Sequence, residues 1–72
     1  MKARRGGASP GEHACGALVS SARAHERAAA LLERMAAAHP EEAELHLQAA
    51  TRQRFWAERD REIAERYSPD GR

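Results

Sequence analysis

The sequence has very few of the residues that cross-link or anchor a small protein. Cys15 is the only cysteine among 72 residues, so no disulfide can form within one chain. A lone thiol is typical of a reducing compartment, and we therefore expect a cytoplasmic protein. The aromatic residues are limited to Phe55, Trp56 and Tyr67. A short chain with so few large side chains often needs oligomerisation to support its fold.

Long apolar runs are also missing. A membrane-spanning helix needs about 20 consecutive apolar residues, and no stretch of the chain approaches that length. The basic start, with Lys2, Arg4 and Arg5, is followed by glycine, proline and charged residues instead of the apolar core of a signal peptide. The sequence therefore predicts no membrane contact, which agrees with a cytoplasmic location.

The charge balance excludes a strong general attraction to polyanions. Lysine and arginine total 12 against 11 acidic residues, which gives a net charge of +1. Acidic and basic residues are interleaved through the second half of the chain, as is typical of a solvated helix surface. We therefore do not expect nucleic acid to be the main partner.

Alanine is abundant, and it has the highest helix propensity of all residues. One helix is predicted over about residues 17–38 and a second over about residues 40–67. The dipeptide His39-Pro40 separates them, because a residue before proline avoids the α region and proline suits the first position of a helix. The link is so short that the two helices should form an antiparallel hairpin.

The two ends of the chain are predicted to lie outside this hairpin. Residues 1–16 hold four of the five glycines and show no periodicity, so they should form a disordered arm. Residues 68–72 contain proline and glycine, which stop a helix and leave a flexible tail.

The predicted first helix is apolar over a wide arc. Placed at 100° intervals, its alanines and large apolar residues cover roughly 200°, against about 100° for an ordinary surface helix. One neighbouring helix cannot cover an arc of that width. We therefore expect an all-α protein whose hairpin assembles into a four-helix bundle as a homodimer, or which docks on another helical protein.

The predicted second helix has an inward stripe with a seven-residue repeat, as helix-to-helix seams require. Ala57 and Ala64 lie at its flank, and Leu47 and Phe55 point away from it. The stripe consists of Leu45, Ala49, Trp56, Ile63 and Tyr67. From the two helices we expect these contact residues: Leu18, His25, Leu31, Leu32, Met35, Leu45, Trp56 and Ile63.

Two polar residues stand out in this apolar setting. His25 lies in the middle of the apolar arc and is expected to be neutral and hydrogen-bonded across the bundle. Protonation of its imidazole would instead place a charge in the packed seam and make association sensitive to pH. Asp60 projects toward the inward stripe, as Gln53 does, and is expected to pair with an arginine of a neighbouring helix.

The histidines are not spaced as metal ligands within one chain. Ligands on one helix usually lie three or four residues apart, whereas His25, His39 and His46 are separated by fourteen and seven residues. A turn at residues 39–40 should place His25 near Arg54 and His46 near Glu33. A metal site would have to form across a dimer, and we expect no metal and no cofactor.

No pair of catalytic groups with a pocket is visible, so we do not expect an enzyme. The preferred interpretation is a self-associating or protein–protein interaction module. The alternative is a small regulatory protein that contacts nucleic acid weakly through Arg52, Arg59, Arg66 and the basic N-terminal arm. A third is a helper that responds to metal ions or protons through its histidines.

Overall fold

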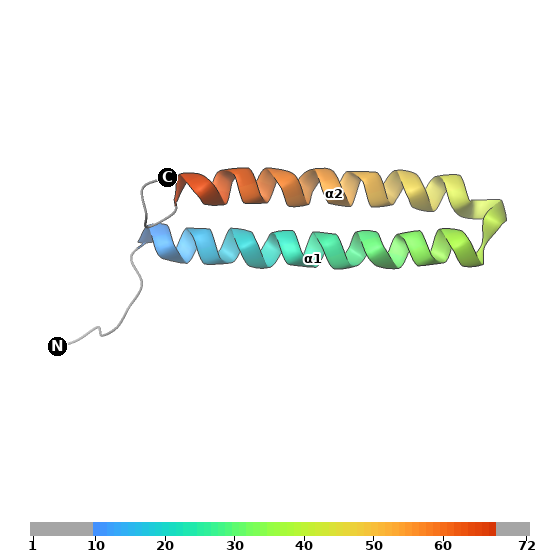
Figure 1. Ribbon diagram of the computed structural model, residues 1–72, viewed down its shortest axis with the longest axis horizontal. Coiled ribbons are helices and arrows are strands. Elements are labelled where there is room, and N and C mark those ends of the chain that lie inside the picture. The colour runs from blue at the N-terminus through green and yellow to red at the C-terminus, as the bar shows by residue number, and fades with distance from the viewer. Residues whose placement is uncertain (1–9, 68–72) are drawn as a thin grey trace.

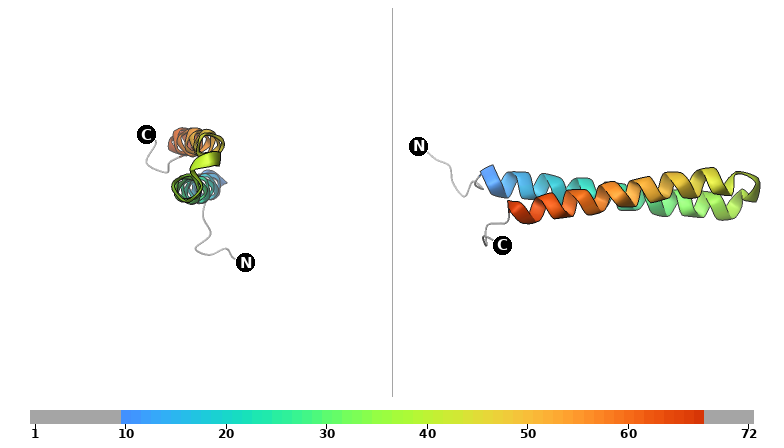
Figure 2. Two further views of the ribbon diagram at one scale, coloured as in Figure 1. Left: turned by 90° about the vertical axis from the view of Figure 1, so that its right-hand side faces the viewer. Right: turned by 90° about the horizontal axis from the view of Figure 1, so that it is seen from above.

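The computed structural model describes residues 10–67, which form two long antiparallel helices joined by a tight turn (Figure 1). Helix α1 spans Pro10–Ala38 and helix α2 spans Ala43–Arg66, with one 3₁₀ turn, η1, at Pro40–Glu42 between them. In the other two views the helices stay side by side and cross at a shallow angle (Figure 2). The predicted all-α antiparallel hairpin is confirmed for this part of the chain.

The turn forms where the sequence predicts it. His39 adopts φ −131° and ψ 76°, outside the α region, as expected of a residue before proline. Its N–H donates to the Met35 carbonyl at 2.9 Å, and its own carbonyl accepts from the Glu42 N–H at 2.9 Å. Pro40 opens the 3₁₀ turn, where its missing N–H leaves no hydrogen bond unmade. The second α-helix therefore begins at Ala43, three residues later than predicted.

Helix α1 begins seven residues earlier than predicted, so part of the expected arm is helical. Pro10 suits the first helical position, and Glu12 places negative charge near the positive end of the helix dipole. Gly16 lies inside this helix although glycine is a weak helix former, and nothing stands within 4 Å of where a Cβ would be, so packing does not require a glycine there. Cys15 and Ala64 line one hollow together, so this stretch packs along the end of α2. The rest of the expected arm and the expected tail lie outside the described residues.

The core of the hairpin is built from alanine. Six residues are buried, three from each helix, and within each helix they recur at every seventh position: Ala22, Ala29, Ala36, Ala50, Ala57 and Ala64. No large side chain of residues 10–67 is fully buried. A methyl group lets two helix backbones approach more closely than a leucine side chain would. The seven-residue repeat keeps this alanine seam facing the partner helix along its length.

The inward stripe predicted for α2 is wrong. Leu45, Trp56 and Tyr67 are 69%, 51% and 46% exposed, whereas Ala57 and Ala64, expected at the flank, lie in the seam itself. One residue corresponds to about 100° of rotation, so the predicted stripe lies beside the seam. The physical reason is that large side chains between the helices would hold them apart, while alanine permits close packing.

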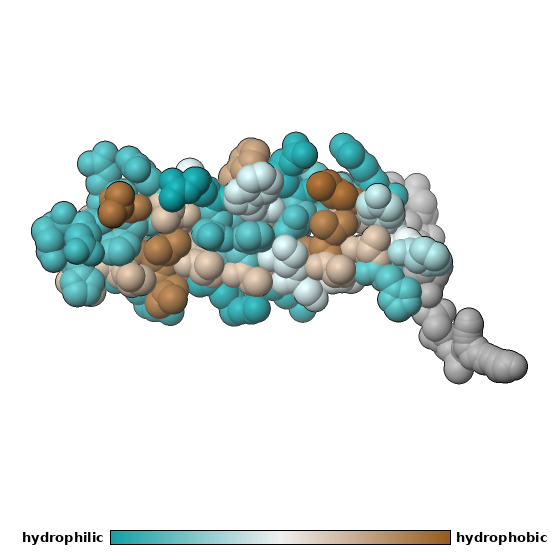
Figure 3. Space-filling model, turned by 180° about the vertical axis from the view of Figure 1, so that it is seen from behind, coloured by the Kyte–Doolittle hydropathy of each residue, from teal (hydrophilic) through white to brown (hydrophobic). Residues whose placement is uncertain are grey.

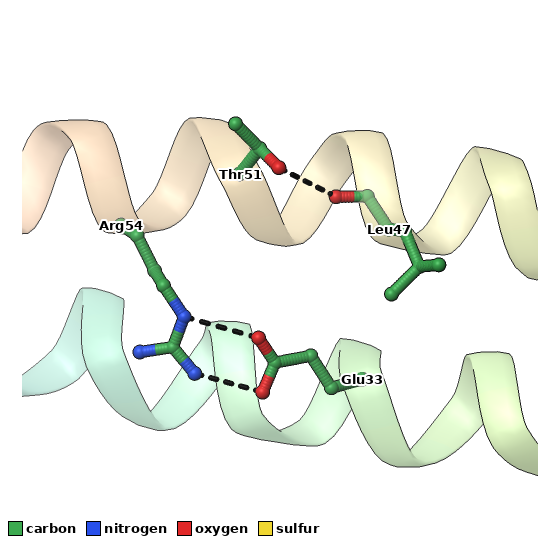
Figure 4. Close-up of polar contacts among 4 residues, drawn as sticks. All are labelled: Glu33, Leu47, Thr51 and Arg54. Carbon is green, nitrogen blue, oxygen red and sulfur yellow. Dashed lines mark hydrogen bonds and ion pairs between the residues drawn. The ribbon is translucent and has the colours of Figure 1, made fainter.

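Two bidentate ion pairs bridge the helices on one side of the alanine seam. Arg54 donates to the Glu33 carboxylate at 3.0 and 2.7 Å (Figure 4), and Arg61 donates to Glu26 at 3.0 and 2.9 Å. These hydrogen bonds hold the pKa of both glutamates below their ordinary value and raise the pKa of both arginines. Glu33 is thus paired with Arg54, and the hydrogen-bond partner of His46 is Glu42.

Candidate interaction face

The two sides of the alanine seam differ in chemistry. Helical spacing places Glu26 and Glu33 on one side of α1, and Arg54 and Arg61 on the adjoining side of α2; we call this side the ion-pair face. The opposite side carries most of the large apolar side chains, and we call it the apolar face. Its residues are Leu18, Ser21, Ala24, His25, Ala28, Leu31, Leu32, Met35, Leu45, His46, Ala49, Gln53, Trp56, Asp60, Ile63 and Tyr67.

All eight residues predicted to make contacts lie on the apolar face. Leu31, Met35, Leu45 and Trp56 are exposed, and the other four are half-buried. Figure 3 looks onto this face: hydrophobic side chains gather in one group toward the turn and another toward the termini, with hydrophilic side chains between them. The stripe that the sequence predicts to face inward therefore contributes to one outer surface. That this surface makes contacts with a partner stays a prediction.

Three residues form the hydrophilic centre of the apolar face, and we call them the polar layer: His25, Gln53 and Asp60. His25 Nδ1 lies 2.5 Å from Gln53 Oε1, and His25 Nε2 lies 3.8 Å from Asp60 Oδ2. The His25 and Asp60 side chains are 33% and 16% exposed. His25 thus finds its hydrogen-bond partner on the other helix of the same hairpin, one residue from Arg54, its predicted neighbour.

Asp60 pairs with a histidine instead of the predicted arginine. Within residues 10–67 its only ion-pair partner is His25, while Arg54 and Arg61 are held by glutamates on the ion-pair face. Asp60 Oδ2 is buried and accepts no hydrogen bond from any group in this part of the chain. A buried carboxylate oxygen without a donor raises the free energy of the folded state. The polar layer is therefore electrostatically incomplete in a single hairpin.

The other histidines of the hairpin lie apart from this layer. His46 contacts Glu42 at 3.1 Å, and His39 lies 3.9 Å from Glu41, both near the turn. One chain brings together no group of three or more histidine, cysteine, aspartate or glutamate side chains able to hold a metal, as far as residues 10–67 are concerned.

The arginines of the nucleic-acid hypothesis form a row on the outer side of α2. Arg52, Arg59 and Arg66 are exposed and recur at every seventh position. None of them forms an ion pair with another residue of the described hairpin. Glu58 and Glu62 are exposed on the same helix, so the positive row is interleaved with negative charge. The row contributes exposed cations but no enclosed site.

Comparison of the chain with protein-family models, with curated proteins and with solved structures finds no match. Neither helix of the described hairpin is long and apolar enough to cross a membrane. The difference between the ion-pair face and the apolar face is therefore the feature of the hairpin that bears on function.

Proposed function

We propose that the chain is a self-associating interaction module without catalytic activity, in which two copies join their apolar faces as a homodimeric four-helix bundle. The observation that carries this proposal is the all-alanine core, because no large side chain of residues 10–67 is fully buried in one hairpin. Leu31, Met35, Leu45 and Trp56 are instead exposed on one face. Exposed apolar patches of this kind, bordered by polar side chains, mark protein interaction sites.

The dimensions of the apolar face suit a dimer. Helix α1 has 29 residues, which at about 1.5 Å per residue gives a length of about 43 Å. Two helices side by side are about 20 Å wide, so the face covers on the order of 800 Å². Each partner of a stable interface of standard size contributes about 800 Å². One copy of the chain therefore offers enough surface for a specific dimer.

A second copy is the favoured partner because the apolar face matches itself. A two-fold axis along the helices packs α1 of one copy on α2 of the other, and an axis across them packs α1 on α1. Both arrangements bring apolar groups against apolar groups (Figure 3). His25 and Gln53 lie near the middle of their helices, and Asp60 lies in the last third of α2. In both arrangements, a two-fold axis that passes through the polar layer brings the two polar layers together.

Two leucines on opposite faces provide the test. Leu45 lies on the apolar face and is 69% exposed, while Leu47 is 48% exposed and lies beside the Glu33–Arg54 pair (Figure 4). Leu45→Glu places a charge in the proposed interface and should give a monomer, whereas Leu47→Glu should leave the dimer intact. Light scattering after size exclusion measures the mass, and circular dichroism confirms that each variant is helical. A dimer that survives Leu45→Glu contradicts the proposal.

The exposed arginine row supports one other function, weak contact with nucleic acid. Arg52, Arg59 and Arg66 are free of ion pairs with the described residues and would reach phosphates from the outer side of α2. Binding of this kind weakens steeply with salt. A salt-dependent mobility shift with mixed-sequence DNA or RNA, lost on replacing the three arginines with glutamine, would favour it. We propose a cytoplasmic location for either function.

A further inference from the structure

The polar layer contains two hydrogen-bond acceptors that face each other. Gln53 Oε1 only accepts, so the His25 Nδ1 beside it carries the proton, and in the neutral imidazole Nε2 is then an acceptor. Nε2 stands 3.8 Å from Asp60 Oδ2, a carboxylate oxygen that has no donor within residues 10–67. Two lone pairs so placed attract a cation between them.

We propose that two copies of the chain close a four-ligand site for a divalent transition metal, with zinc as the best match, using His25 Nε2 and Asp60 Oδ2 from each copy. This inference rests on the proposed self-association. Imidazole nitrogen and carboxylate oxygen are both ordinary zinc ligands. One chain supplies a pair, and the two chains together supply the four ligands of a closed tetrahedral site.

The geometry of the pair suits coordination of one ion. Zinc holds nitrogen and oxygen ligands at about 2.0–2.2 Å, which places two tetrahedral ligand atoms about 3.4 Å apart. The observed separation of 3.8 Å between His25 Nε2 and Asp60 Oδ2 exceeds this value by a few tenths of an ångström, and Oδ2 is buried in one hairpin. Coordination therefore needs a rotation of the Asp60 side chain that turns this oxygen toward the second copy. Gln53 supplies the supporting interaction, because metal-binding histidines characteristically donate their second ring N–H to an oxygen acceptor.

The position of the pair explains why two copies are needed. His25 comes from the middle of α1 and Asp60 from the last third of α2, so their contact joins the two helices on the apolar face. A two-fold axis through that point, along or across the helices, places the two pairs opposite each other. Without a cation, the dimer would bring two buried carboxylates together at the centre of its interface. The metal removes that repulsion and should tighten association.

Zinc titration of the full chain tests the site. The protein is stripped with chelator, kept reduced and compared with a Cys15→Ser variant, so that a thiol is not the ligand. We expect one zinc ion per two chains in calorimetry and a dimer dissociation constant at least tenfold lower with zinc than with chelator. Cobalt in place of zinc should give the visible absorption of a four-coordinate ion.

Variants separate this site from other histidines. His25→Ala and Asp60→Asn should each abolish the zinc response, and Asp60→Asn keeps the size of the side chain. His39→Ala is the matched control, because His39 lies in the turn, 3.9 Å from Glu41 and outside both helices. The control should retain the response in full. One zinc ion bound to each single chain, or binding that survives Asp60→Asn, overturns the proposal.

The same experiments distinguish failure of the site from failure of the dimer. A dimer in chelator that does not respond to zinc overturns the metal site and leaves self-association standing. A chain that is monomeric in chelator and dimeric with zinc supports both and makes assembly dependent on metal. A monomer under every condition overturns both.

Discussion

Trp56→Ala is the most informative single perturbation of the proposed interface. Trp56 is the only tryptophan, lies on the apolar face and is 51% exposed in the hairpin. An aromatic side chain buries about 150–250 Å², so docking of the half that is exposed would remove on the order of 100 Å² from water. At about 25 cal/mol per Å² this contributes about 2.5 kcal/mol per copy.

A two-fold interface contains the substitution twice. The loss is then about 5 kcal/mol per dimer, and each 1.4 kcal/mol changes the dissociation constant about tenfold. We therefore expect the dimer dissociation constant to rise by about three to four orders of magnitude. Sedimentation equilibrium measures that constant. In the wild-type chain, Trp56 fluorescence should also shift to shorter wavelength as the protein is concentrated and the indole leaves water.

Phe55→Ala is the matched control. Phe55 is 52% exposed and packs edge to face on Trp56, with ring centroids 5.3 Å apart, but it lies on the outer side of α2. The control removes the same ring contact and leaves the apolar face intact. We expect a dissociation constant close to that of the wild type. Equal weakening by both substitutions, or none by Trp56→Ala, would refute the placement of the interface.

Three further predictions concern the hairpin itself. Ala29→Leu should lower the free energy of unfolding by about 1–3 kcal/mol in thermal denaturation, because a larger side chain in the seam separates the helices. Ala37 is exposed, so Ala37→Leu should leave the free energy of unfolding unchanged. Equal effects of the two substitutions would contradict an alanine core. Gly16→Ala should raise the free energy of unfolding by about 0.5–1 kcal/mol, because the position is helical and has room for a Cβ. An unchanged melting temperature would argue against a helix at this position. The arginine hydrogen bonds lower the pKa of Glu26 and Glu33, so this stabilisation is present above their ordinary pKa of 4.5 and is lost as the pH falls through the lowered values. The melting temperature of the wild type should therefore fall in acid more than that of a Glu26→Gln, Glu33→Gln double variant, and parallel curves would contradict it.

Local signals in the sequence predict the architecture well. His39-Pro40 locates the turn because its effect depends only on the backbone of two residues. The wide apolar arc of residues 17–38 predicts apolar side chains that the second helix leaves uncovered, and Leu31 and Met35 are exposed in the hairpin. That a partner covers them stays a prediction. The start of α1 at Pro10 is not predicted, because the four glycines of residues 1–16 favour disorder. Pro10 and Glu12 are the residues in this stretch that favour the start of a helix.

The inner packing could not be predicted from the same signals. Weighting residues by size places Trp56 and Leu45 inside, but two helices alone pack closest through their smallest side chains. The seven-residue repeat of alanine in both helices was the available signal for this seam. The polar layer was missed as a unit because it depends on the register between helices. His25, Gln53 and Asp60 stand out one by one in the sequence, and only the folded hairpin brings them into contact.

The most direct test of the central claim is sedimentation equilibrium of the wild-type chain over the micromolar range, with helicity followed at the same concentrations. We predict a mass that approaches that of two chains as the concentration rises. A single, fully helical chain at every concentration would contradict the claim that the apolar face needs a partner.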